Sequence, residues 1–203
     1  MIVVVDYGLG NTGSILNAFE KIGITAVKSA EGNVIRNASG IVFPGDGAAG
    51  QAMRNIEMRQ LIEPIKDFIA KGKPFLGICL GMQILLTESE EGNTKCLGIV
   101  KGRVRKFNSF IKTPQIGWNK IKFQKEREKI KNLSKNINDL SYFYFINSYY
   151  CDPTDKTIIM ATTDHFGEFC SIFVKGNILG VQFHPEKSAN AGFQLLKNWT
   201  KLC

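Results

Sequence analysis

The chain has 203 residues, of which 44% are hydrophobic and 22% are charged. This composition is typical of folded globular proteins and argues against disordered or fibrous ones. No apolar run approaches the ~20 residues of a membrane-spanning helix, and the first residues lack the basic segment of a cleaved leader. We therefore expect one domain spanning residues 1–203, in a cytoplasmic protein that does not contact a membrane.

Strand and helix patterns alternate in the first half of the chain. A β-branched run at 2–7 predicts a strand covered on both faces, and apolar residues at helical spacing predict a helix at 11–22. Further strands are expected at 25–29, 40–45 and 74–81, and helical runs at 58–72 and 82–89. This alternation predicts a parallel sheet with helices on both sides.

The second half consists mainly of strand candidates separated by turn residues. They lie at 98–107, 120–124, 142–151, 157–163, 170–176 and 178–183. An amphipathic helix is expected at 191–202. We therefore predict an α/β fold with a central, mostly parallel sheet, flanking helices and added antiparallel strands in the C-terminal half.

The formal net charge is +8, and a dense basic segment lies at 120–135, KIKFQKEREKIKNLSK. We interpret this segment as a solvated basic surface. Docking of an acidic protein is the alternative, and nucleic-acid binding is not expected because the segment lacks the aromatic pattern of RNA-binding modules. The five cysteines are scattered without a CxxC pair, which favours reduced thiols over a disulfide framework or a zinc site.

The stretch GICLGMQ places Cys79 between two glycines, directly after an apolar strand. An unpaired cysteine is usually a packing residue. Here, however, a strand that ends in Gly-x-Cys-x-Gly and continues into a helix has the pattern of a nucleophile elbow, which exposes its central side chain. The backbone N–H groups at the start of the helix help to hold a thiolate. We therefore predict that Cys79 is a nucleophile.

A cysteine nucleophile needs a base, and the chain has two histidines, His165 and His184. His165 lies in the polar stretch TTDHFGEF, which is typical of a solvated histidine. His184 follows a strand directly and begins HPEK. Because Pro185 favours extended geometry at the residue before it, the side chains of His184 and Glu186 can reach the same side of the chain. The pattern thus predicts a Cys79–His184–Glu186 triad.

These motifs resemble those of the class I, triad-type glutamine amidotransferases. Besides GICLGMQ and VQFHPEKS, the chain carries DYGLGN, VFPGDGAAGQAM, PQIGWN and NSYY in the matching order along essentially its whole length. Within that family they are most similar to the glutaminase subunits of imidazole glycerol phosphate synthase. Several motifs in the right order are specific, whereas a lone GxCxG would be weak.

The resemblance implies an activity and a partner. Cys79 would attack the side-chain amide of L-glutamine, release ammonia and form a γ-glutamyl thioester that water hydrolyses to glutamate. The ammonia would pass through a channel to a (βα)8-barrel cyclase, which forms imidazole glycerol phosphate and aminoimidazole carboxamide ribonucleotide (AICAR) in histidine biosynthesis. The resemblance implies no metal or organic cofactor.

The resemblance also assigns residues around the nucleophile. The backbone N–H groups of Leu80 and Asp46 would form the oxyanion hole, and the glycine-rich PGDG loop could complete that hole only in an activated state. Glutamine would be bound by Gly47, Gln83, Glu91, Ser148 and Tyr149, with Glu91 paired to the ammonium group. The partner would contact Asn11, Trp118, Tyr144 and Lys187, although large aromatics such as Trp118 and Tyr144 are more often core than interface residues.

Two positions depart from the family pattern. Asn147 stands before SYY where many members of the histidine pathway have histidine, and Asp46 is acidic where an apolar residue is expected. These departures leave open a paralogous function, which is ammonia supply to a sugar-modifying amidotransferase in cell-surface glycan synthesis. A hydrolase that acts alone and a binding module without turnover are further alternatives.

Overall fold

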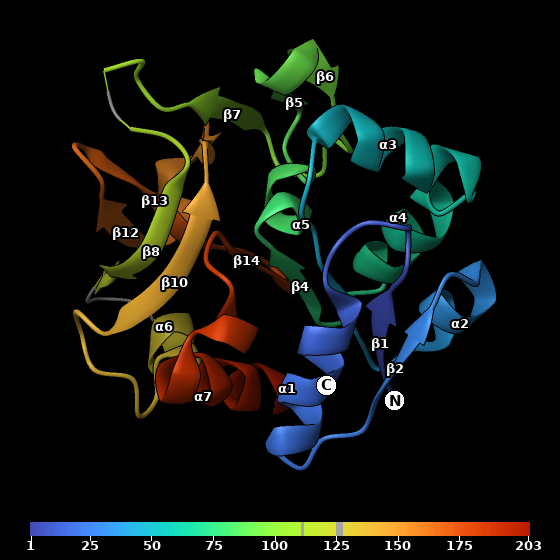
Figure 1. The fold of residues 1–203 in the computed structure, drawn as a ribbon. Helices are drawn as coiled ribbons and strands as arrows, with labels where there is room; N and C mark the ends of the chain where they lie inside the picture. Colours follow the sequence, from blue (N-terminus) through green and yellow to red (C-terminus); the bar gives the residue numbers. More distant parts are fainter. Residues whose placement is uncertain (111, 125–127) are drawn as a thin grey trace.

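A long mixed sheet runs through the molecule in the computed structural model, which describes residues 1–110, 112–124 and 128–203 (Figure 1). Five neighbouring strands are parallel to one another. In spatial order they are β2 (Ala26–Ser29), β1 (Ile2–Val5), β3 (Gly40–Phe43), β4 (Phe75–Ile78) and β14 (Ile178–Val181). This half confirms the predicted parallel sheet.

The sheet continues from β14 into strands that are mostly antiparallel, as the second half of the sequence predicted. They follow in the order β13 (Glu168–Lys175), β11 (Tyr149–Pro153), β7 (Gly102–Lys106), β5 (Glu88–Ser89) and β6 (Thr94–Lys95), and β5 and β7 are parallel. Two further strands extend the sheet beside β13: β12 (Ile159–Asp164) pairs with β13, and β9 (Lys122–Phe123) pairs with β12.

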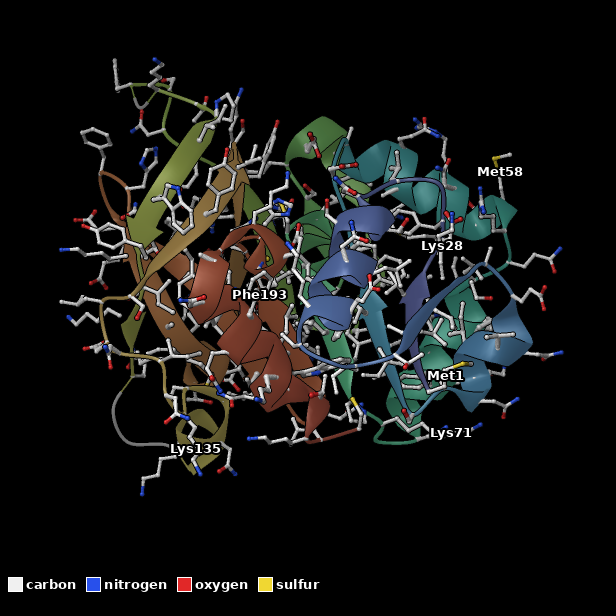
Figure 2. The ribbon with its side chains drawn as sticks, turned by 60° about the horizontal axis from the view of Figure 1, so that its bottom comes forward. Met1, Lys28, Met58, Lys71, Lys135 and Phe193 are labelled. Atoms are coloured by element: carbon white, nitrogen blue, oxygen red, sulfur yellow. The ribbon has the colours of Figure 1, made fainter. Side chains whose placement is uncertain are left out.

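Helices cover both faces of the parallel strands. Side chains of β1 alternate, so that Ile2 and Val4 pack with α1 (Thr12–Lys21) and α7 (Ala189–Thr200). Val3 and Val5 pack on the other side with α2 (Gly32–Asn37), α3 (Ala49–Met58) and α4 (Ile62–Ala70). The helices α1 and α7 lie side by side, and Lys21 Nζ of α1 is 5.8 Å from the centroid of the Phe193 ring of α7 (Figure 2).

A separate two-stranded antiparallel ribbon is formed by β8 (Gln115–Lys120) and β10 (Tyr142–Asn147). Its side chains also alternate: Phe143 and Phe145 are buried in the core, whereas Trp118 and Tyr142 are exposed. The remaining helical segments are α5 (Leu80–Gln83), α6 (Glu128–Leu133) and the 3₁₀ turns η1 (Glu91–Asn93), η2 (Lys156–Ile158) and η3 (Pro185–Lys187). Within the described ranges, no helix is long and apolar enough to cross a membrane.

Several predicted element bounds were wrong. The helix expected at 82–89 ends at Gln83, because the carbonyls of Ile84, Leu85 and Leu86 accept hydrogen bonds from a loop at 97–100 instead of from a continuing helix. The strand expected at 142–151 is two strands in different sheets, divided at Ser148.

Several helices were missed or misplaced by the sequence reading. The core-facing side of α3 is formed largely by Ala49 and Ala52, whose small side chains give a weak hydrophobic signal, so this helix was not predicted. The helical run expected at 58–72 begins only at Ile62, because Gln60 has a positive φ of 54° that interrupts the chain between α3 and α4. The short helix α2 was also missed, since Ile35 is its one buried residue.

The basic segment at 120–135 is described in part, since residues 125–127 lie outside the described ranges. Lys120, Lys122 and Lys135 are exposed, which agrees with a solvated basic surface.

Candidate active site

The neighbouring parallel strands β4 and β14 bring the predicted nucleophile and base to one edge of the sheet. Gly77 of β4 pairs with Gly180 of β14, and Ile78 pairs with Val181. Cys79 follows β4 directly, and its backbone N–H donates to the carbonyl of Val181 at 2.8 Å. His184 lies three residues beyond β14, so both side chains leave the sheet at the carboxyl ends of adjacent strands.

Cys79 has the strained backbone of an elbow, with φ 53° and ψ −111°. A non-glycine residue in this region costs about 1–3 kcal/mol and persists only where the surroundings enforce it. The enforcing contact is close packing: a Cβ on Gly81 would lie 1.9 Å from the carbonyl oxygen of Phe43, and one on Gly77 would lie 2.7 Å from the carbonyl oxygen of Gly81. The flanking glycines are therefore required by space.

Replacing Gly81 by alanine should lower the free energy of unfolding by at least about 2–3 kcal/mol, because the backbone of β3 or of the elbow must move to admit the methyl group. Chemical denaturation would measure the loss. Gly13→Ala is the matched control, since a Cβ there would meet only Asn11 Oδ1 at 3.7 Å on helix α1, and its stability should stay unchanged or rise slightly. Equal stabilities of the two variants would contradict the packing argument.

His184 and Glu186 are joined as predicted. His184 Nδ1 lies 2.8 Å from Glu186 Oε1, and the two side chains are 10% and 2% exposed. A carboxylate at Nδ1 holds the proton on that nitrogen and leaves Nε2 free to exchange a proton. The backbone is fixed as well, because His184 N donates to the carbonyl of Tyr144 at 2.9 Å and Ser188 Oγ donates to the carbonyl of His184 at 2.6 Å.

The charge state of His184 depends on both neighbours. Burial by itself would lower its pKa, but the charge of Cys79, a hydrogen bond with Cys79 and the hydrogen bond and charge of Glu186 together raise the pKa to about 10. A cationic imidazole between a thiolate and a carboxylate is the arrangement that activates a cysteine nucleophile. Sulfur, imidazole and carboxylate therefore form one interacting group.

A cavity of about 270 Å³ opens beside Cys79 and His184. Most of the residues that the sequence assigned to the site line it. They are Asn11, Asp46, Gly47, Cys79, Leu80, Gln83, Glu91, Ser148, Tyr149, His184 and Lys187. Pro114, Ile146 and Asn147 also line the cavity and were not assigned to the site. Glu186 is not among the lining residues and meets the site through His184.

The loop after β3 packs directly on the elbow. A Cβ on Gly45 would lie 2.6 Å from Leu80 Cβ and 2.8 Å from the Gly81 nitrogen. Asp46 Oδ1 accepts a hydrogen bond from the Gly10 N–H at 2.8 Å, which ties this loop to the loop after β1. Among the described residues, the Leu80 N–H meets no acceptor, so it is available to a bound group.

The Tyr7 side chain anchors the loop after β3. Its hydroxyl donates to the carbonyl of Pro44 at 2.7 Å. Burial, followed by the negative charges of Asp46 and Cys79, raises the pKa of Tyr7 well above its usual range. The hydroxyl therefore stays protonated and keeps donating.

Like Asp46, the assigned residues Glu91 and Asn11 are engaged within the protein. Glu91 Oε2 accepts from the Ala49 N–H at the start of α3 at 2.7 Å, which leaves its other oxygen for a ligand. Asn11 Oδ1 accepts from the Ser14 N–H at 2.9 Å and caps α1.

Trp118 and Tyr144 lie outside the cavity lining, on the β8–β10 ribbon. Their rings meet edge to face with centroids 5.8 Å apart, and Trp118 is 52% exposed. The core alternative for Trp118 was therefore wrong.

Sequence reasoning missed a buried amide chain beneath the cavity. Gln83 Nε2 donates to the carbonyl of Tyr149 and to Gln182 Oε1, both at 3.0 Å. Gln182 Nε2 in turn donates to Cys79 Sγ at 3.5 Å. The available signal was a lone glutamine in the otherwise apolar run ILGVQF, which must find partners if it is buried.

Sequence comparisons with known proteins agree on one family. The family model Glutamine amidotransferase class-I matches residues 3–201. The chain is 44% identical to the imidazole glycerol phosphate synthase subunit HisH of Chlorobium chlorochromatii, with both chains fully covered. It is 45% identical to the subunit of the same name from Chlorobaculum tepidum over 99% of this chain and all of that one.

Solved structures share the fold at lower identity. A glutamine amidotransferase crystal structure superposes with a TM-score of 0.77 at 16% identity, covering 100% of this chain and 98% of that one. A chain of PurLQS from Thermotoga maritima superposes with a TM-score of 0.76 at 17% identity, covering 98% and 97%. At this identity the likeness concerns the fold.

Proposed function

Because this chain belongs to the class I glutamine amidotransferases and is a full-length relative of HisH subunits, we propose that Cys79, His184 and Glu186 hydrolyse L-glutamine. The chain is a glutaminase subunit of imidazole glycerol phosphate synthase in histidine biosynthesis, the function for which these relatives are named. No finding favours the alternative in glycan synthesis. The observation that carries the catalytic proposal is the meeting of sulfur, imidazole and carboxylate beside a cavity.

The geometry supports a two-step reaction. The Cys79 thiolate attacks the carboxamide carbon of glutamine, and the imidazolium of His184 gives its proton to the departing nitrogen, so ammonia leaves and a thioester remains. His184 then takes a proton from water, which adds to the thioester carbon. The carbon–sulfur bond breaks, the electron pair returns to sulfur, and glutamate is released. Glu186 holds the imidazole tautomer in both steps.

The developing oxyanion needs two donors. The N–H of Leu80, which has no acceptor among the described residues, is one, and the backbone N–H of Asp46 in the loop packed against the elbow is proposed as the other. The wall formed by Gly47, Gln83, Ser148 and Tyr149 would bind the polar atoms of glutamine, and the remaining oxygen of Glu91 would accept its ammonium group.

The partner is proposed to dock on the outer face of the β8–β10 ribbon. Ile116 and Trp118 are 64% and 52% exposed there, and large exposed apolar side chains on one face are typical of protein interfaces. The ribbon also reaches the cavity, because Ile146 at the end of β10 lines it. Asn11 and Lys187 line the same cavity. A (βα)8-barrel cyclase on this face would receive ammonia close to where it forms.

The test is a glutaminase assay of the purified chain with and without the barrel cyclase and its nucleotide substrate. Glutamate release that rises strongly with the partner supports the proposal. Full activity of the isolated chain would contradict partner dependence, and peptide cleavage without the partner would indicate a stand-alone hydrolase. Silence in both arms would favour a binding module.

Trp118→Ala should weaken the partner by about 10- to 100-fold in Kd, as expected for a central interface tryptophan. Isothermal titration with the cyclase measures the change. Met58→Ala is the matched control, because Met58 is 80% exposed at the far end of α3 (Figure 2). Equal affinities of the two variants would contradict docking of the partner on the β8–β10 ribbon.

A further inference from the structure

Gln182 is a fully buried amide that directly touches the nucleophile. It follows β14, two residues before His184, and its Nε2 lies 3.5 Å from Cys79 Sγ. We propose that Gln182 donates a hydrogen bond that holds the Cys79 sulfur as an oriented thiolate in both halves of the reaction. This inference rests on the proposed role of Cys79 as nucleophile.

The direction of this hydrogen bond follows from a chain of contacts. The carbonyl oxygen of Tyr149 can only accept, so the side-chain nitrogen of Gln83 must face it. The same nitrogen lies 3.0 Å from the side-chain amide of Gln182, so the oxygen of that amide, Oε1, must face it. An amide with its oxygen fixed on one side has its nitrogen on the other, and for Gln182 that side faces the sulfur. The reversed amide would set nitrogen against nitrogen and oxygen against sulfur.

The remaining contacts of the sulfur make this donor important. Cys79 Sγ lies 3.6 Å from the carbonyl oxygen of Ile146, which is a partner for a thiol but repels a thiolate. His184 supplies the charge that favours the thiolate. Gln182 is then the neutral donor that replaces the lost interaction with Ile146 when the proton leaves, without competing for that proton.

The amide acts at two points of the proposed reaction. Before attack it helps to fix the direction of the sulfur, which is buried. During hydrolysis of the thioester the carbon–sulfur bond breaks and the electron pair returns to sulfur, so the same N–H stabilises the leaving thiolate. Because Gln83 lines the cavity and holds Gln182, the wall that contacts the ligand is connected to the nucleophile.

The experiment uses Gln182→Met, which keeps the size of the side chain but removes the donor, and Gln182→Glu, which keeps the shape but turns an acceptor towards the sulfur. The first readout is the rate of alkylation of Cys79 by iodoacetamide at pH 7, followed by peptide mass spectrometry. The exposed Cys203 in the same molecule is the internal reference. Ser171→Ala is the matched control, because Ser171 is a buried neighbour whose hydroxyl has no partner among the described residues.

We expect Gln182→Met to slow alkylation of Cys79 about 10- to 100-fold, as for the loss of one hydrogen bond to a charged group, with Cys203 unchanged. Gln182→Glu should slow it further, and Ser171→Ala should match the wild type. In the complex with the cyclase, kcat for glutamine should fall by a similar factor while KM changes less than about twofold.

Wild-type alkylation and kcat in Gln182→Met would overturn the proposal, as would faster alkylation in Gln182→Glu. If the methionine variant does not fold, the glutamate variant alone decides between these outcomes. The alkylation arm does not require glutaminase activity. A wild-type complex that releases no glutamate would thus contradict the proposed function without deciding the role of Gln182.

Discussion

Cys79→Ala will abolish glutamine-dependent turnover of the complex while added ammonium still supports the partner's reaction. Among the described residues that line the cavity, Cys79 is the only cysteine, and its charge and hydrogen bond act directly on His184. Loss of a nucleophile from a catalytic triad typically costs on the order of 10⁶ in kcat. Cys79→Ser should behave in the same way, since a hydroxyl beside this imidazole is far less ionised than a thiol.

Two assays on one preparation measure this result: glutamate release from glutamine, and product formation by the cyclase with ammonium. Cys203→Ala, at an exposed cysteine, is the matched control and should be indistinguishable from the wild type. If the alanine variant kept more than a trace of glutamine-dependent turnover, Cys79 would not be the nucleophile.

Glu186→Gln will lower glutaminase kcat by about 10³- to 10⁴-fold, the effect seen when the orienting carboxylate of a triad becomes an amide. It will also shift the pH profile. The pKa of His184 is raised from 6.5 to about 10, with Glu186 among the causes, so the imidazole stays protonated through neutral pH. Without the carboxylate this pKa falls, and the alkaline decline of the rate begins at lower pH.

The same shift has a consequence for folding. A group whose pKa is raised in the folded state contributes stability fully below its unfolded value of about 6.5 and loses that contribution as pH rises through about 10.

The pH–rate profile of Glu186→Gln should be recorded between pH 6 and 11, with the ammonium-dependent reaction as reference. Glu168→Gln, at an exposed position of β13, is the control. An unmoved alkaline limb would mean that Glu186 does not act through His184.

The sequence predicted the site better than it predicted the elements around it. Cys79, His184 and Glu186 lie in short motifs whose geometry is local: an elbow between glycines, and a proline that extends the chain before a carboxylate. The meeting of these motifs depends on β14 lying parallel to β4, so that their carboxyl ends share one edge. The sequence reading had placed this strand, 178–183, among the antiparallel additions. The mostly parallel sheet with antiparallel additions was confirmed.

The misses have physical causes. The inner face of α3 is made from alanines, so its periodicity is faint. The proposed role of Gln182 depends on its contacts with Gln83 and Cys79, which are about a hundred positions away along the chain. No local sequence pattern predicts such contacts. The hydrogen bond from the Ala49 N–H to Glu91 could not be predicted for the same reason. Long-range polar contacts require the three-dimensional arrangement.

The placement of β14 between β4 and β13 has a consequence for biosynthesis. His184 and Glu186, two of the three members of the proposed triad, follow this strand and emerge from the ribosome after Cys79. The thiol therefore has no base beside it until β14 occupies its place between β4 and β13.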